Sequence, residues 1–165
     1  MTLFLVRHGI AEDEPPGGKG GDDARPLSAR GRRRTCAAAR GFAAAFGAVD
    51  AIVSSPLLRA RQTADLLAEA LRLKAPPAAD PVLRPEAQAA ETVTWLAKRS
   101  ERSLVLVGHM PHLESLASLL VAGREGLSLP FRKAGVCELA FDGKAAPGNA
   151  SLVAFLPARV LRKVT

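Results

Sequence analysis

Short apolar runs alternate along the chain with longer segments in which apolar residues recur at every third or fourth position. The runs predict buried strands, and the three-to-four spacing predicts helices that cover them. The expected strands are residues 3–6, 51–53, 104–107, 136–141 and 150–156. The expected helices span about 29–46, 56–71, 88–99 and 111–121. Strands that alternate with helices predict a three-layer α/β/α sandwich.

Local residues support this layout. Ser28 is a suitable N-cap for the first helix, and Ser55 followed by Pro56 is typical of a cap and first turn for the second. Leu104–Val107 is continuously apolar, as expected of a strand in the middle of a covered parallel sheet. The last two expected strands are joined by turn-rich residues 142–149, which predicts an antiparallel C-terminal edge on a mostly parallel sheet.

The chain is expected to form a single domain, residues 1–165, because no repeat or linker divides it. Apolar residues make up 48% of the sequence, which excludes a disordered protein. Cys36 and Cys137 lack the spacing of a zinc site or a disulfide framework, so we interpret them as core residues in a reducing compartment. No signal peptide or membrane-spanning apolar stretch is visible. We therefore expect a cytoplasmic protein with no membrane partner. The sequence does not indicate an oligomeric state, and a monomer is the favoured expectation.

The formal net charge of +7 indicates anionic partners, such as phosphorylated metabolites, phosphoproteins or nucleic acid. Much of this charge lies at residues 30–34 and 159–163, where a solvated helix face and a charged tail are the simplest interpretation. The sequence contains no nucleic-acid-binding motif and no aromatic residues interleaved with the basic ones. Nucleic acid is therefore not an expected partner.

Two expected strands end in the same manner. The first runs into Arg7, His8 and Gly9, and the strand at 104–107 runs into Gly108 and His109. In open α/β sheets, ligands bind at the carboxyl ends of the strands. Two histidines at equivalent strand ends, each beside a glycine, therefore indicate an active site at this edge of the sheet.

Arg59 follows the expected strand at 51–53, in the first turn of the next helix, where free backbone N–H groups already favour an anion. Arg7 and Arg59 could form a multidentate clamp for a phosphoryl group. Histidine suits covalent phosphoryl transfer, because its ordinary pKa near 6.5 leaves a neutral form at working pH.

Three segments together resemble the histidine phosphatase superfamily, also called the phosphoglycerate mutase-like family: LVRHG at 5–9, SSPLLRARQTA at 54–64 and VGHMP at 107–111. The segment from Arg25 to Gly31 and the segment LVGHMPHLESLASLL at 106–120 are most similar to the SixA-type phosphohistidine phosphatase branch. The resemblance runs from Met1 to about Val121, and it implies a phosphoglycerate mutase-like fold and a hydrolase, specifically a phosphatase, that needs no metal or other cofactor.

The resemblance also implies roles for individual residues. His8 would be the nucleophile that takes the phosphoryl group, and Arg7 and Arg59 would bind the phosphate oxygens. His109 would stabilise the transferring group from the other side, and Arg25 would reach the phosphate or the substrate from its loop.

Larger members of the family use a Glu or Asp as general acid, and the corresponding region here offers Glu86, for which an exposed loop carboxylate is the simpler interpretation. An alcohol leaves poorly without a proton, whereas imidazole leaves readily as a neutral group. The site therefore suits a phosphohistidine on a phosphorelay or phosphocarrier protein. Two alternatives stay open: a small phosphomonoesterase for a sugar, nucleotide or cobalamin-precursor phosphate, and an inactive phosphate- or nucleic-acid-binding module.

Two further features have no assigned chemistry. The Gly- and Pro-rich segment 12–26 does not meet the spacing of a phosphate-binding P-loop and is expected to be a mobile surface loop. His112 is expected to face solvent near the mouth of the site.

Overall fold

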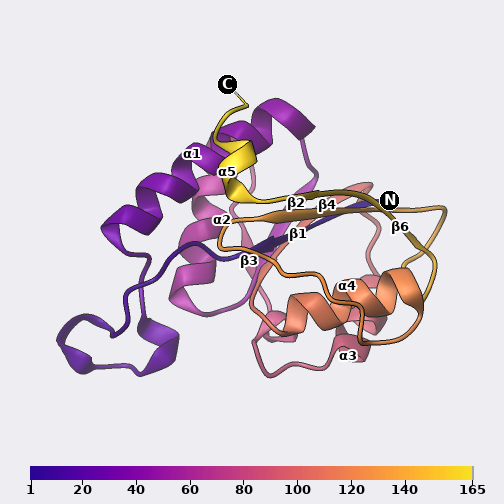
Figure 1. Cartoon of the computed structure of the whole chain (residues 1–165), viewed down its shortest axis with the longest axis horizontal. Helices are drawn as coiled ribbons and strands as arrows, with labels where there is room; N and C mark the ends of the chain where they lie inside the picture. The colour runs from indigo at the N-terminus through magenta and orange to yellow at the C-terminus, as the bar shows by residue number, and fades with distance from the viewer. Residues whose placement is uncertain (165) are drawn as a thin grey trace.

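A six-stranded mixed sheet forms the middle layer of the protein (Figure 1). The structure, a computed structural model, describes residues 1–164. The strands are β1 (Thr2–Arg7), β2 (Ala51–Ser54), β3 (Ala78–Ala79), β4 (Ser103–Gly108), β5 (Val136–Phe141) and β6 (Ala150–Leu156), in the spatial order β3-β2-β4-β1-β5-β6. The strands β1 to β4 are parallel, and β5 and β6 add an antiparallel hairpin beside β1. The predicted sheet, with its antiparallel C-terminal edge, is confirmed.

Helices cover both faces of this sheet (Figure 1). One face is covered by α1 (Ala29–Phe46), α2 (Leu58–Leu71) and the short α5 (Ala158–Leu161). The opposite face is covered by α3 (Ala89–Leu96) and α4 (His112–Ala122). Three short 3-10 helices, Pro16–Gly18, Asp22–Ala24 and Pro81–Leu83, lie in the connections. Within residues 1–164, no helix is both long and apolar enough to cross a membrane.

The alternation of side chains along β1 divides the core into two layers. Leu3 and Leu5 pack with the residues of α3 and α4, whereas Phe4 and Val6 pack with those of α1, α2 and α5. Because all four side chains are buried, β1 lies in the interior of the sheet with a helical layer on each side. This position fixes the place of the residues that follow it.

The carboxyl ends of β1, β2 and β4 lie side by side. Val107 of β4 pairs with Val6 of β1 on one side and with Ser54 of β2 on the other. The pairing continues past the strands, since the His8 amide donates to the Gly108 carbonyl at 3.0 Å and the Ser55 amide donates to the Val107 carbonyl at 2.8 Å. Residues that follow these three strands are thus brought to a single edge.

The structure corrects the predicted start of the second helix. Ser55 is not its N-cap, because the Ser55 amide is still bonded to β4 and the chain turns only at the next two residues. Leu57 occupies the cap position, and the Ser55 hydroxyl accepts from the Leu57 amide at 3.3 Å. In contrast, the Ser28 cap is confirmed, since its hydroxyl accepts from the Gly31 amide at 2.9 Å.

Among the strands and α-helices of residues 1–164, β3 and α5 were not predicted, and neither were the three short 3-10 helices. The strand β3 and the helix α5 are two and four residues long, so neither shows a hydrophobic period. The short α5 packs against α1, and the contact depends on Gly41, because a Cβ there would collide with the Leu161 carbonyl.

Candidate active site

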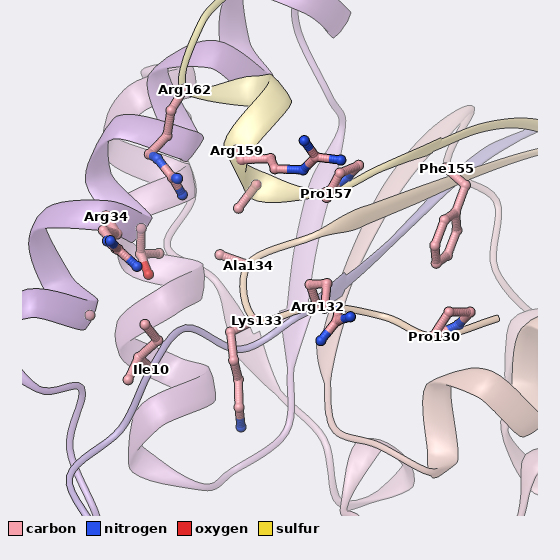
Figure 2. Close-up of a pocket in the computed structure, with 13 residues that line it drawn as sticks. Ile10, Arg34, Pro130, Arg132, Lys133, Ala134, Phe155, Pro157, Arg159 and Arg162 are labelled. Atoms are coloured by element: carbon pink, nitrogen blue, oxygen red, sulfur yellow. The ribbon is translucent and has the colours of Figure 1, made fainter.

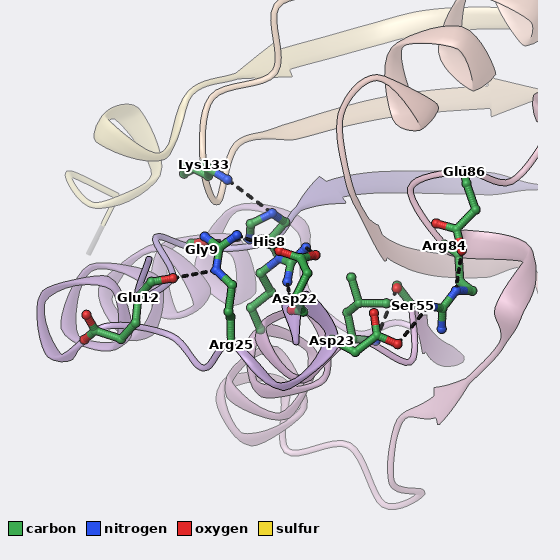
Figure 3. Close-up of polar contacts among 12 residues, drawn as sticks. His8, Gly9, Glu12, Asp22, Asp23, Arg25, Ser55, Arg84, Glu86 and Lys133 are labelled. Atoms are coloured by element: carbon green, nitrogen blue, oxygen red, sulfur yellow. Dashed lines mark hydrogen bonds and ion pairs between the residues drawn. The ribbon is translucent and has the colours of Figure 1, made fainter. Parts of the chain in front are cut away.

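His8 directly follows β1 and is buried, with 4% of its surface exposed. Its Nδ1 lies 2.7 Å from the Gly9 carbonyl oxygen, which can only accept, so Nδ1 carries the ring proton. The lone pair is therefore on Nε2, which lies 3.2 Å from Nζ of Lys133 (Figure 3). Burial, together with the charges of Lys133 and His109, lowers the pKa of His8 to about 2. His8 is thus a neutral imidazole with its Nε2 lone pair available for attack.

Gly9 and Thr63 hold this histidine in place. The Gly9 amide donates to the Thr63 hydroxyl at 3.0 Å, and that hydroxyl donates to the Arg59 carbonyl at 2.7 Å. A Cβ on Gly9 would collide with the Thr35 hydroxyl of α1. These contacts hold the loop after β1 against α1 and α2.

His109 lies opposite His8 after β4, with the two ring centroids 4.9 Å apart. It is buried, and within residues 1–164 its Nε2 has no hydrogen-bond partner. Burial, with the charges of Arg59 and Lys133, lowers its pKa to about 3. Because buried polar atoms are normally paired, an unpartnered Nε2 beside His8 indicates a position for a ligand oxygen.

The two arginines of the expected clamp are anchored in different ways. Arg7 donates from Nη1 to the Phe131 carbonyl at 2.7 Å, and its buried Nε has no partner among residues 1–164. Arg59 is 5% exposed, and its charge lowers the pKa of both His8 and His109. The structure therefore brings together the four residues singled out in the sequence, Arg7, His8, Arg59 and His109.

The sequence of this chain matches a known protein family. Residues 3–86 match the sequence pattern of the histidine phosphatase superfamily (branch 1). The chain belongs to the histidine phosphatase superfamily. It is accordingly a hydrolase of the phosphatase class, as the resemblance implied. An uncharacterized protein of Picosynechococcus sp. is 37% identical over 142 residues, which cover 84% of each chain.

Solved structures share the fold of this superfamily member. The protein histidine phosphatase SixA complexed with tungstate has a TM-score of 0.83 at 22% identity, covering 98% of this chain and 99% of that one. A phosphoserine phosphatase mutant from Entamoeba histolytica, in complex with phosphoserine, has a TM-score of 0.71 at 16% identity, covering 96% and 98%. A mycobacterial glucosyl-3-phosphoglycerate phosphatase has a TM-score of 0.67 at 21% identity, covering 96% and 98%. The phosphoglycerate mutase-like fold is confirmed.

Lys133 is a member of the site that was not predicted. It precedes β5, which runs antiparallel to β1, so the start of β5 lies at the same edge as the end of β1. Burial and the charges of Arg7 and Arg59 lower the pKa of Lys133 to about 8. The sequence predicted the C-terminal hairpin but not its position beside the first strand, and this position is what brings the residues before Val136 to the active edge.

Asp22 is the second unpredicted member. Its carboxylate lies 2.7 Å from Nη2 of Arg59 and 2.6 Å from Nη1 of Arg25, and its carbonyl accepts from Nη1 of Arg59 at 2.7 Å (Figure 3). The Arg59 guanidinium, more than any other group, holds the pKa of Asp22 below its usual range. The Gly- and Pro-rich segment 12–26 thus carries a carboxylate to the arginine that was expected to bind phosphate.

Arg25 forms no hydrogen bond with His8 among residues 1–164. It donates from Nε to the Glu12 carbonyl at 2.7 Å and binds Asp22, so it holds the loop that carries this carboxylate. Glu86 is exposed and lies 2.6 Å from Arg84, which lowers the pKa of its carboxyl group. Arg84 also binds Asp23 at 2.8 Å, which ties segment 12–26 to the residues after β3 (Figure 3).

The expectation for His112 is wrong. Its side chain is buried, and its Nε2 lies 2.9 Å from the hydroxyl of Thr92 on α3. Because α4 packs against α3, the first turn of α4 faces the core at this position rather than solvent. Within residues 1–164, no group of three or more His, Cys, Asp or Glu side chains is arranged to hold a metal ion.

Proposed function

We propose that this phosphatase removes the phosphoryl group from a phosphorylated histidine of another protein through a covalent phosphohistidine on His8. The observation that carries the choice of substrate is the state of the nearby carboxylates. Asp22 is paired with Arg59 and Glu86 with Arg84, and both pairs lower the carboxyl pKa. Neither carboxyl group is suited to protonate a departing alkoxide.

A phosphohistidine needs no such donor. Its imidazole can be protonated beforehand on the ring nitrogen that does not carry phosphorus, since the ordinary pKa of imidazole is near 6.5. Attack by Nε2 of His8 then forms one N–P bond and breaks another, and the substrate ring leaves as neutral imidazole. His8 keeps its Nδ1 proton, which the Gly9 carbonyl accepts at 2.7 Å.

In the second step, a water oxygen attacks phosphorus and the N–P bond to His8 breaks, with its electron pair returning to Nε2. The phosphorylated ring carries a proton on Nδ1, so neutral His8 and dihydrogen phosphate form without a further proton donor. The cations stabilise the equatorial oxygens in both steps, which is the main requirement of phosphoryl transfer. Arg7, Arg59 and Lys133 supply this charge, and His109 offers Nε2 as a hydrogen-bond donor.

Lys133 is placed to assist the equatorial oxygens but not the leaving group. Its Nζ lies 3.2 Å from the attacking Nε2 of His8. In an in-line displacement, the leaving atom departs on the far side of phosphorus from the nucleophile. The lysine therefore does not replace the missing acid, and an alkyl phosphate ester remains a poor substrate.

The test compares three substrates: a phosphohistidine-bearing protein, an alkyl ester such as phosphoserine, and p-nitrophenyl phosphate, whose phenolate leaves without a proton. We expect turnover of the first and third, and weak turnover of the alkyl ester. His8→Ala should abolish turnover of all three substrates. The control is His112→Asn, at a buried histidine that binds Thr92 and is not part of the candidate active site, and it should retain this turnover. Faster turnover of the alkyl ester than of the phosphohistidine protein would favour the small phosphomonoesterase instead.

A further inference from the structure

A cavity of about 590 Å³ lies beside the candidate active site and shares Lys133 with it (Figure 2). None of Arg7, His8, Arg59 and His109 lines it, so it is a separate space. Its wall is formed by α1, by the segment before β5 and by the chain from the end of β6 into α5. Lys133 joins the two spaces, because its side chain lines the cavity while its Nζ lies 3.2 Å from the nucleophile.

The cavity is strongly basic. Its cationic lining residues are Arg34, Arg132, Lys133, Arg159 and Arg162, and no Asp or Glu lines it. Within residues 1–164, none of these five forms an ion pair. Arg159 and Arg162 are three residues apart in the α5 segment, a spacing that places like charges on one side. A cleft lined by charges of one sign raises the local concentration of anions, so this cavity is suited to an anionic partner.

We propose that this cavity binds an acidic segment of the phosphorylated protein while its phosphohistidine reaches His8. The inference rests on the proposed function, because it names the chemistry of the partner that brings the phosphoryl group. One transferred phosphoryl group is served by the cations around His8. The cavity has five cations on three separate segments of the chain, and only Lys133 is shared with the candidate active site. Cations spread in this way match several carboxylates along a peptide segment better than one small anion.

Apolar side chains on the same elements favour a protein over a small molecule. Phe155 lines the cavity beside the cations. Leu152 and Val153 on β6 and Val160 on α5 are exposed large apolar residues, with 42%, 57% and 38% of their surfaces exposed. They lie on β6, the edge strand of the sheet, and on α5, and both of these elements also contribute residues to the wall of the cavity. Exposed apolar side chains with polar or charged residues around them are typical of protein-binding surfaces.

The experiment uses paired charge reversals with equal change in net charge. Arg34→Glu with Arg159→Glu alters the cavity, and Arg33→Glu with Lys163→Glu alters exposed residues of the same two regions that do not line it. The probe is a fluorescein-labelled Glu-rich decapeptide without phosphate, measured by anisotropy at low and physiological salt. We expect the cavity pair to weaken binding about tenfold or more and the control pair to change it by less than about twofold.

Equal weakening by both pairs would overturn the proposal, because the effect would then be one of net charge. The proposal would also be overturned, in favour of nucleic acid, by two results together: the unaltered protein does not bind the peptide, and it binds a labelled DNA duplex with an affinity that only the cavity pair lowers. The binding assay needs no turnover, so it gives a result even if the enzyme proves to be an ester phosphatase. In turnover, we expect the cavity pair to raise KM for an acidic phosphohistidine protein and to leave free phosphohistidine unaffected.

Discussion

The Asp22 carboxylate binds Arg59, so a phosphoryl group that binds the same guanidinium would compete with it. The change that tests this contact is Asp22→Asn, which removes the charge and leaves the bond from Arg59 to the residue 22 carbonyl. Hydrogen bonds to a charged group contribute about 1.5–3 kcal/mol, and exposed ion pairs about 0.2–1 kcal/mol. Arg59 is 5% exposed and the Asp22 side chain 54%, so an intermediate value applies, about 1–2 kcal/mol.

A competing contact of that strength reduces the affinity for an incoming anion by the same free energy, a factor of about 5–30. We therefore expect Asp22→Asn to lower the inhibition constants of phosphate and vanadate by about 5–30-fold, measured on p-nitrophenyl phosphate. KM should fall with them, and kcat should stay within about twofold. Asp23→Asn is the matched control, because Asp23 is the next residue, carries the same charge and binds Arg84 instead.

An unchanged or weaker affinity for phosphate in Asp22→Asn would refute this account of the loop. A collapse of kcat would refute it in another way, since it would make Asp22 part of the chemistry. Equal gains in Asp22→Asn and Asp23→Asn would show that only the net charge of the loop matters.

Further outcomes are expected at three residues, Lys133, Thr63 and Gly41. Lys133→Met should lower kcat about 10–100-fold, because it removes a cation beside the nucleophile. The pKa of Lys133 is about 8, so wild-type kcat/KM should fall as the pH rises through that value and the ammonium group loses its proton. In Lys133→Arg, which keeps the positive charge at high pH, kcat/KM should not fall in this pH range. Thr63→Val leaves the Gly9 amide without its acceptor, so it should lower the free energy of unfolding in urea by about 1–3 kcal/mol and also lower kcat. A loss of stability with unchanged kcat would limit Thr63 to a structural role. Gly41→Ala should destabilise the protein by about 1–3 kcal/mol through the clash with the Leu161 carbonyl, with p-nitrophenyl phosphate turnover retained at low temperature.

The sequence predicted the parts of the fold that have a strong hydrophobic period. The strands at Leu3–Val6 and Leu104–Val107 are long and apolar, and their ends identified His8 and His109 because parallel strands end at one edge. The elements that were missed are short. The alanines of β3 and the four residues of α5 are held by contacts with β2 and α1, and such contacts are not visible in a local pattern.

The missed members of the site come from segments distant in sequence. Asp22 lies in the short 3-10 helix Asp22–Ala24 and Lys133 in the turn before β5, and neither lies in a motif with a diagnostic spacing. Their roles depend on the tertiary arrangement that carries segment 12–26 to Arg59 and the start of β5 to His8. The error at His112 has the same cause, because the packing of α4 on α3 decides which side of the helix is buried.

The most direct test of the central claim is to identify the phosphorylated atom during turnover. The enzyme is mixed with phosphohistidine protein, quenched within milliseconds in alkali, and analysed by mass spectrometry and phosphorus NMR. We expect an acid-labile phosphoryl group on Nε2 of His8, since Nδ1 is occupied by its bond to Gly9, and no label in His8→Ala. The account would be contradicted if His8→Ala released phosphate at the wild-type rate, or if the phosphoryl group were found on any other residue of the enzyme.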